Sequence, residues 1–442
     1  MRRVHTRTMK YVTGKPQRDK QLIEAVVRSY GPISREGIHE LTELRRSAMS
    51  GLVRELIDEG RLVEAGSTSS RTSIGRRQIL LRLNERYRYV AAVEFDEDSV
   101  RSGLFDLHPS PVQTHTESAY ILAGRDGLVR QLISAVHGIL KRTGVSADAL
   151  IGIGIADPGL VDRRRGVAVT SSTLEFWRDV PLKHIFEQEF GVATTLETKT
   201  RAKAVAERMR GAGEMRENMI YVDYGAGIGA GVITQGQSLY GENGAAGEFG
   251  HIHIDDDGPA CKCGSYGCLE AVAGARAIES KVRKAILDGA VSEVQRLADN
   301  DPERITAEMI LEASASGDKI ASHVVADAGL QLGRGIANLV NLFNPAIVVL
   351  DRRLALAGQE MLDRIVRVVR RQALTTSSAD CDVRFARIGD EAGMLGAALL
   401  ILEEHFEIPV LKPARFEVEP EGLALSAPSG VDEPASGPSV LA

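Results

Sequence analysis

The spacing of apolar residues predicts three short helices at the start of the chain. In the first helix, expected over residues 17–29, apolar positions recur three and four residues apart. Gly31 and Pro32 end it, and the hydroxyl of Ser34 can cap a second, short helix. A third helix is expected from about residue 45 to residue 59. The expected inward-facing residues are Leu22, Ile23, Val26, Val27, Ile38, Leu41, Met49, Leu52, Val53, Leu56 and Ile57.

Two strands follow these helices. The first begins at residues 62–64, the second covers residues 78–83, and the polar residues 66–77 form the tip between them. Three helices followed by a hairpin are typical of a winged helix-turn-helix. We therefore expect an all-α-plus-wing domain over residues 1–82.

The rest of the chain alternates strands and helices, as α/β proteins do. The pattern predicts strands at 89–93, 102–106, 150–156 and 219–223, and a helix at 128–141. The last strand leads directly into a glycine-rich run at residues 225–231. Such a run can bind phosphate, but glycine also lets one backbone pack tightly on another, so the run alone does not decide between the two.

Charge is distributed unevenly between these two parts. The 442 residues contain 54 Lys and Arg against 60 Asp and Glu, a formal net charge of −6. Residues 1–82 carry 17 basic and 9 acidic residues, a net charge of +8, so the other 360 residues carry −14. A small basic unit on an acidic body indicates a module that binds a polyanion, although a solvated basic arm without a partner would have the same composition.

The third helix carries most of the candidate DNA-binding residues. Its apolar stripe would hold it against the other two helices and leave its N-terminal turn free to enter the major groove of double-stranded DNA. Arginine there can make two hydrogen bonds to guanine, and serine can bind phosphates or base edges. Arginines at the base of the wing could reach the minor groove or the flanking phosphates. The alternative is a winged helix that contacts another protein and not DNA. The candidates are Arg45, Arg46, Ser47, Ser50, Arg76 and Arg77.

Three of the four cysteines lie within eight residues and predict a metal site. Together with a nearby histidine they supply the usual ligands of a closed, tetrahedral zinc site, which would shape a loop and would not activate water. His253 is a rival ligand, and unligated buried thiols are the other alternative. Cys381 lies far away in the sequence and is expected to be an ordinary small core residue. The expected ligands are His251, Cys261, Cys263 and Cys268.

The sequence around these cysteines resembles the signature of the ROK family, named for repressors, open reading frames and kinases. The matching stretches read GAAGEFGH at 244–251 and CKCGSYGCLE at 261–270. The resemblance extends from about Arg18 to about Leu402, and the N-terminal part resembles the DNA-binding half of the family's regulators. It implies a two-lobed actin/hexokinase-like body with a structural Zn²⁺. Further matching stretches are ADPGLVD at 156–162, WRDVPL at 177–182 and ANLVNLFNPAIVVL at 337–350.

The family contains both kinases and regulators, and this chain departs from the kinase pattern. Kinases of the family carry an aspartate as general base, whereas Lys199 occupies that position and a protonated ammonium cannot accept a proton. Their first phosphate loop corresponds to residues 94–98, where four carboxylates would repel a triphosphate. Ala226 replaces a threonine of the glycine run, and residues 351–353 replace a glycine-rich turn. We therefore expect no enzyme activity, with an active ATP-dependent sugar kinase as the alternative.

The resemblance also implies a site for a sugar or sugar-derivative effector. Two glutamates and a histidine match family positions that bind sugar hydroxyls, a role that suits carboxylates because they accept two hydroxyl protons. Threonines replace two expected asparagines, and Lys199 adds a cation that would favour an acidic or phosphorylated sugar. A vestigial pocket without a ligand is the alternative. The expected effector-binding residues are Glu248, His251, Glu270, Thr173, Thr198 and Lys199.

These patterns together predict a DNA-binding transcription regulator, expected to be a repressor that binds operator DNA as a homodimer or homotetramer. No stretch approaches the ~20 apolar residues of a membrane helix, and the N-terminus lacks an apolar signal region, so we expect a cytoplasmic, nucleoid-associated protein. The body is expected over residues 88–408, with lobes of about 88–205 plus 390–408 and about 206–389. Residues 409–442 contain six of the fifteen prolines and are expected to form a disordered tail.

Overall fold

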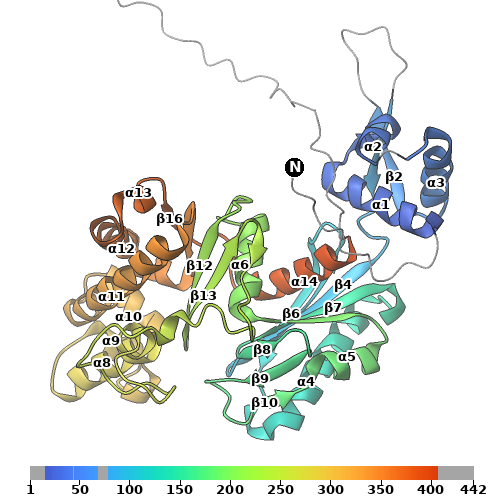
Figure 1. Cartoon of the computed structure of the whole chain (residues 1–442). Coiled ribbons are helices and arrows are strands. Elements are labelled where there is room, and N and C mark those ends of the chain that lie inside the picture. Colours follow the sequence, from blue (N-terminus) through green and yellow to red (C-terminus); the bar gives the residue numbers. More distant parts are fainter. Residues whose placement is uncertain (1–14, 43, 68–77, 407–442) are drawn as a thin grey trace, which may run out of the picture.

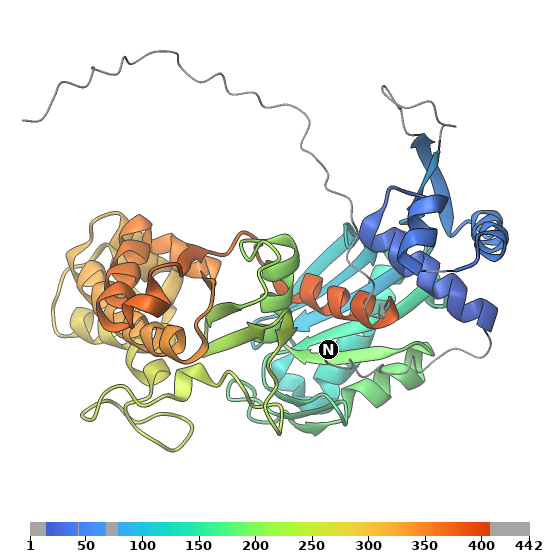
Figure 2. The same cartoon turned by 45° about the horizontal axis from the view of Figure 1, so that its top comes forward.

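The computed structural model describes residues 15–42, 44–67 and 78–406 of the chain. A small N-terminal unit lies against one lobe of a two-lobed body, and the second lobe lies at the far end of the molecule (Figure 1 and Figure 2). Within the described residues, no helix is long and apolar enough to cross a membrane.

The N-terminal unit contains the helices and strands that the apolar spacing predicts. Its elements are α1 (Lys15–Tyr30), β1 (Ile33–Ser34), α2 (Arg35–Thr42), α3 (Arg46–Asp58), β2 (Leu62–Ser67) and β3 (Ile79–Leu83), and its strands form an antiparallel sheet in the order β1-β3-β2. The cap on α2 is confirmed, since Oγ of Ser34 accepts a hydrogen bond of 3.1 Å from the backbone N–H of Gly37. The third helix begins one residue later than its earliest expected position, with Arg45 at its N-cap.

The core of this unit continues into the body. Most of the expected inward-facing residues are buried, whereas Leu22, Leu52 and Ile57 are only partly buried. The same cluster includes residues of the last helix of the body, α14 (Ala392–His405), among them Ile401 and Leu402. Apolar packing therefore joins the N-terminal unit directly to α14.

The first lobe is built on a five-stranded sheet in the order β11-β7-β4-β5-β6. Successive residues of β4 point to opposite faces: Ala91 and Val93 pack with α4 and α5, whereas Val90 and Ala92 pack with α14. The predicted strands are present but begin or end a few residues beyond the expected bounds. The elements are β4 (Tyr89–Phe95), β5 (Ser99–Asp106), β6 (Pro111–Ser118), α4 (Gly124–Thr143), β7 (Leu150–Asp157), β8 (Leu160–Asp162), β9 (Val167–Thr170), β10 (Arg178–Val180), α5 (Leu182–Phe190), β11 (Thr194–Thr198) and α6 (Lys199–Arg210).

The second lobe repeats this topology in a second five-stranded sheet, ordered β14-β13-β12-β15-β16. In each lobe the first three strands along the chain pair antiparallel to one another. The fourth strand then pairs parallel to the free edge of the first, and the fifth pairs parallel to the fourth. Helices cover one face of this sheet, and α6 covers the other (Figure 1). The elements are β12 (Met219–Tyr224), β13 (Ile228–Thr234), β14 (Gln237–Ser238), η3 (Phe249–His251), α7 (Leu269–Ala273), α8 (Ala275–Leu287), α9 (Glu293–Leu297), α10 (Ala307–Ala315), α11 (Lys319–Phe343), β15 (Ile347–Leu350), η5 (Arg352–Ala357), α12 (Gln359–Gln372), α13 (Thr375–Ser378) and β16 (Asp382–Phe385).

Helix α6 lies between the two lobes and is packed closely on both sides. A methyl group placed on Gly396 of α14 would come within 1.8 Å of the carbonyl oxygen of Ala202 in α6. One placed on Gly231 of β13 would come within 2.5 Å of Cβ of Ala204. Both glycines are required because no side chain fits where these backbones meet.

Replacing Gly396 with alanine is expected to lower the free energy of unfolding by about 2–3 kcal/mol, because α6 and α14 must move apart to admit the methyl group. Urea unfolding measures this change. Gly51→Ala is the matched control, since a methyl group there has no atom within 4 Å and should stabilise α3 slightly. Equal stability of G396A and the parent chain would contradict the close approach.

Candidate functional site

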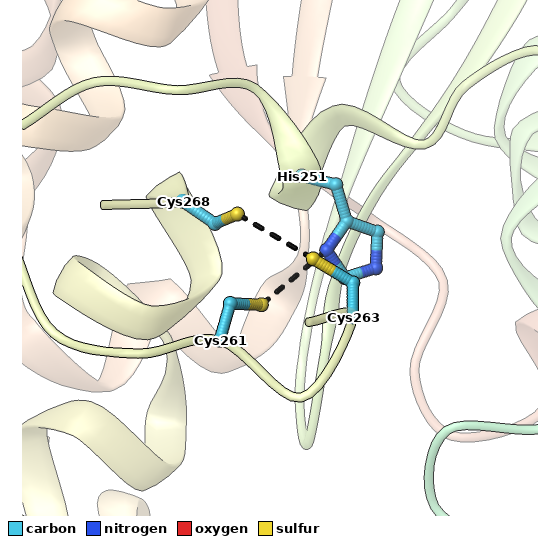
Figure 3. Close-up of side chains that lie close together, drawn as sticks. All are labelled: His251, Cys261, Cys263 and Cys268. Carbon is cyan, nitrogen blue, oxygen red and sulfur yellow. Dashed lines mark hydrogen bonds between the residues drawn. The ribbon is translucent and has the colours of Figure 1, made fainter. Parts of the chain in front are cut away.

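One histidine and three cysteines come together beside α7. Figure 3 shows these four side chains, and their ligand atoms all lie within 4.8 Å of one another. Sγ of Cys261 lies 3.6 Å from Nδ1 of His251, and Sγ of Cys263 lies 3.7 Å from Sγ of Cys268. A tetrahedral ion with bonds of about 2.3 Å to sulfur and about 2.0 Å to nitrogen separates its ligands by about 3.5–3.8 Å. The cluster therefore fits a tetrahedral metal ion.

The rival ligand His253 lies outside this cluster. Its Nδ1 is 3.0 Å from the carbonyl oxygen of Tyr266, and its Nε2 is 2.8 Å from the carboxylate of Asp256. His251 lies in η3 and not in a strand, so the two histidines do not alternate as strand residues would. Cys381 packs partly buried against the core of the second lobe, as expected.

Two of the expected effector-binding residues, Glu248 and Glu270, make different contacts. Nε2 of His251 faces Glu248 at 3.9 Å, so one ring nitrogen is directed at the thiols and the other at a largely exposed carboxylate. Glu270, in the first turn of α7, accepts a hydrogen bond of 3.0 Å from the backbone N–H of Ile228. Glu270 therefore holds the start of β13, and one of its oxygens is already engaged.

The glycine-rich run at 225–231 has a packing role. A methyl group on Gly229 would come within 2.9 Å of Oγ1 of Thr200, and Gly231 contacts α6 as described above. Of the two explanations that the sequence leaves open, close approach of backbones is the one that the geometry supports for these two glycines.

The remaining effector candidates lie at the N-terminus of α6 and after β9. Thr198 caps α6 by accepting a hydrogen bond of 3.3 Å from the backbone N–H of Arg201. Thr173 lies with its hydroxyl 3.2 Å from that of Ser171. Among the described residues, no hydrogen bond joins Thr173 or Thr198 to the group around His251.

Lys199 is paired with a carboxylate of the turn that follows β4. Its Nζ lies 3.1 Å from Oδ2 of Asp96. Burial alone would raise the pKa of Asp96, but the Lys199 ammonium, together with Arg101 and the backbone N–H of Ser99, outweighs burial and holds that pKa below its usual range. The charge of Lys199 is therefore neutralised by the chain itself.

The expectation that four carboxylates crowd this turn is wrong for Glu94. Glu94 points into the protein, is 1% exposed, and accepts a hydrogen bond of 3.1 Å from the backbone N–H of Met394 in α14. Burial raises the pKa of its carboxyl group, against the opposing effect of nearby cations. Glu97 in turn lies 3.5 Å from Arg276 of the second lobe. Alternation along β4 puts Glu94 on the same face as Val90 and Ala92, which pack with α14, and this pattern could have shown that its carboxylate lies on a covered face.

A second partly buried lysine, which the sequence reasoning missed, joins α6 to the second lobe. Nζ of Lys203 lies 2.8 Å from Asp223 in β12 and 2.9 Å from Asp351, which follows β15. Tyr221 donates a hydrogen bond of 2.8 Å to Asp351, and Thr200 one of 2.8 Å to Asp223. Burial would lower the pKa of Lys203, but the two carboxylates outweigh burial and raise it. Both acids lie at the ends of apolar strands, and this pattern in the sequence could have identified them as partners for a lysine.

Arg353 lies across the turn that begins the glycine run. Its Nη1 donates a hydrogen bond of 3.2 Å to the carbonyl oxygen of Tyr224, and its Nε lies 3.1 Å from Glu308. A methyl group on Gly225 would come within 2.7 Å of the same guanidinium. The side chain therefore covers this turn.

The candidate DNA-binding residues of α3 lie on its exposed face. Arg45, Arg46, Ser47 and Ser50 are all exposed, and Arg46 forms an ion pair with Glu36 of α2. Arg76 and Arg77 lie outside the described residues.

Two lobes with the same strand order, separated by a shared helix, define the actin/hexokinase-like class of α/β proteins. The chain belongs to the ROK family, whose sequence pattern matches residues 100–404. It is 29% identical to a putative xylose repressor of Caldicellulosiruptor over 393 residues, 89% of this chain and 97% of the relative. It is 30% identical to the DNA-binding transcriptional dual regulator NagC of Escherichia coli over 389 residues, 87% of this chain and 92% of that protein.

Solved structures of the family include both regulators and kinases. A ROK family transcriptional regulator, described as a homologue of the E. coli MLC protein, matches 89% of this chain and 97% of its own with a TM-score of 0.76 and 27% identity. A ROK family glucokinase from Streptomyces griseus, solved with glucose and AMPPNP, matches 71% of this chain and 98% of its own with a TM-score of 0.63 and 28% identity. The regulator thus matches a larger share of this chain than the kinase does.

Replacing Lys203 with methionine is expected to lower the free energy of unfolding by about 3–5 kcal/mol, because two buried carboxylates would lose their counter-charge. Lys284→Met is the matched control, since Lys284 is exposed and its pair with Asp288 lies in solvent. Thermal and urea unfolding measure both variants. A K203M chain as stable as K284M would show that the network contributes little.

Proposed function

We propose that this chain is a DNA-binding transcription regulator, a repressor, controlled by a sugar-type effector. Residues 1–82 would form a winged helix-turn-helix and residues 88–408 a catalytically inactive body of two lobes. The observation that carries the proposal is the exposed polar face of α3 on a unit docked against a ROK body. Relatives that match nearly the whole chain are named as repressors or transcriptional regulators.

The proposed DNA contact uses the first turns of α3. Met49, Val53 and Leu56 are buried and hold the helix by its apolar side, which leaves the opposite side exposed to solvent. A helix presented in this way can lie in a major groove with its N-terminal residues at the base edges. The residues proposed to bind DNA are Arg45, Arg46, Ser47 and Ser50, together with Arg76 and Arg77 from the wing.

Replacing Arg46 with alanine is expected to weaken binding to an operator duplex roughly fivefold to a hundredfold, as the loss of one arginine contact to a base or phosphate does. The probe is a duplex selected by the protein from a random pool, titrated by fluorescence anisotropy at several salt concentrations. If Arg46 contacts a phosphate, the slope of log affinity against log salt concentration should become shallower by about one in R46A.

Arg296→Ala is the matched control for charge. Arg296 is exposed in α9 of the second lobe, so its loss changes the net charge equally but leaves the proposed contact intact. Binding that is indifferent to salt and unchanged in R46A would exclude the proposed DNA interface.

For the His and Cys cluster we propose a structural Zn²⁺ bound by His251, Cys261, Cys263 and Cys268. Four protein ligands complete a tetrahedron and leave no position for water, so the ion would hold the loop between η3 and α7. Glu248 directly precedes η3 and Glu270 lies in the first turn of α7, so the two acids flank this loop, which gives the metal a role in shaping the effector side.

Replacing Cys263 with serine is expected to remove most of the bound zinc and to lower the unfolding temperature, because a hydroxyl is a poor substitute for a thiolate ligand. Metal analysis of the purified chain and thermal unfolding measure the two effects. Cys381→Ser is the control and should retain its zinc, since Cys381 lies outside the cluster. Full metal content in C263S would contradict the proposed ligand set.

We further propose that the body does not transfer phosphate. Lys199 holds the position of the general base and is ion-paired with Asp96, Lys203 occupies the space between two strand-end aspartates, and Arg353 covers the glycine turn. We infer that these cations of the chain itself occupy the region in which a kinase of the family would hold a nucleotide. Sustained ADP release with any sugar in a coupled assay would support the alternative, an active sugar kinase.

For the effector we propose a neutral sugar or sugar derivative. The pairing of Lys199 with Asp96 removes the reason to favour an acidic or phosphorylated sugar. Glu248 and His251 retain groups that can bind hydroxyls, and Glu270, Thr173 and Thr198 are further candidates. A thermal-shift screen of sugars and amino sugars decides between a working and a vestigial site, since a ligand that binds the folded chain stabilises it.

The proposed partners follow from this function. A two-fold operator is bound by paired helix-turn-helix units, so we propose a homodimer or homotetramer that acts at the nucleoid in the cytoplasm. The predicted tail at 409–442 lies outside the described residues and has no proposed role.

A further inference from the structure

The loop that leads from β14 to Glu248 is fastened to the first lobe. Nη1 of Arg201 in α6 donates hydrogen bonds of 3.0 Å to the carbonyl oxygen of Gly244 and 3.3 Å to that of Ala246. The guanidinium of Arg201 also lies over the ring of Tyr240, 5.3 Å from its centroid. We name residues 239–247 the effector-side loop, because Glu248 follows it directly.

Arg163, which follows β8 in the first lobe, joins this loop to the last helix of the body. Its Nη1 donates a hydrogen bond to the hydroxyl of Tyr240, and its guanidinium lies 5.2 Å from the centroid of that ring. Its Nη2 forms an ion pair with Glu404 of α14. The second oxygen of Glu404 accepts a hydrogen bond of 2.7 Å from the hydroxyl of Thr195 in β11.

Tyr240 is suited to receive this arginine. Burial, helped by the neighbouring Glu197 carboxylate, raises the pKa of Tyr240 to about 12, so the phenol stays neutral at physiological pH. A neutral hydroxyl accepts one N–H of the guanidinium while Glu404 accepts another. The planar fork of arginine permits both contacts at once, which the single ammonium of lysine does not.

The residue next to Glu404 makes the corresponding contact to the N-terminal unit. Oε1 of Glu403 lies 3.1 Å from Nη1 of Arg28 in α1. The guanidinium of Arg28 also lies over the ring of Phe406, 5.1 Å from its centroid. The last turn of α14 thus carries two adjacent acids, one paired toward the effector-side loop and one paired toward the unit that carries α3.

We propose that Arg163 is a positioning residue that couples the effector-side loop to the DNA-binding unit through the last turn of α14. The proposal rests on the proposed function, in which Glu248 contacts the effector and α3 contacts DNA. A ligand that moves Glu248 moves the loop, shifts Tyr240 against Arg163, and changes the support of Glu404. Because Glu403 is adjacent, the docking of α1 changes with it, and so does the position of α3.

The test uses the full chain without DNA or effector, so its outcome does not depend on whether the proposed function is correct. Backbone hydrogen exchange is compared between the parent chain and Arg163→Met. We expect exchange to be about twofold to fivefold faster in the last turn of α14 and also in α1, which Arg163 does not touch, as the loss of partly exposed ion pairs and their support predicts.

Two further variants separate coupling from general loosening. Tyr240→Phe removes only the hydroxyl that accepts from Arg163, and it should accelerate exchange in the same two segments to a smaller extent. Arg165→Met is the matched control, because Arg165 is exposed in the same turn and its contact with Asp162 is 4.0 Å long. It should leave α1 unchanged.

The distribution of the effect decides the proposal. Faster exchange confined to the effector-side loop and the turn around Arg163, with α1 at the parent rate in both R163M and Y240F, would overturn the coupling. Equal acceleration throughout the chain, α12 included, would overturn it as well, because it would identify Arg163 as a general stabiliser.

Discussion

The close packing of α6 between α14 and β13 is the constraint on which the rest of this structure depends. Glycines at both contacts allow the helix to approach within a distance that no side chain would permit. One helix is thereby fixed to the last helix, which covers the first sheet, and to the sheet of the second lobe, and its residues face both lobes. Lys199 and Lys203, four residues apart on α6, meet carboxylates from different lobes for this reason.

These lysines explain how a body built like a sugar kinase can serve another purpose. A nucleotide site holds carboxylates and backbone turns ready for a ligand with its own metal ions. Here Asp96, Glu97, Asp223 and Asp351 are already paired with cations of the chain itself. The pairs are partly buried, and breaking one would leave an uncompensated charge. This pairing agrees with the proposal that the body does not transfer phosphate.

The last helix gives this body a route to the N-terminal unit. Its apolar face belongs to the same core cluster as α1, α2 and α3, and its final turn holds two acids with partners on opposite sides. A shift at one end of such a helix reaches the other without a long flexible linker, since few residues separate β3 from β4. The proposed coupling of the effector and DNA sites then depends on packing and on a small number of ion pairs.

The sequence by itself determined the local elements and the members of the His and Cys cluster. Apolar spacing identified α1, α2, α3 and the strands around them, because helical and strand periods are local properties of the chain, and clustered cysteines identified a site closed by nearby residues. Only the tertiary structure decided which charges meet. Asp96 and Lys199, or Arg163 and Glu404, are separated by a hundred residues or more, and no periodicity relates them. The burial of Glu94 against α14, which overturned its expected role, likewise depends on the helix that folds back onto the first sheet.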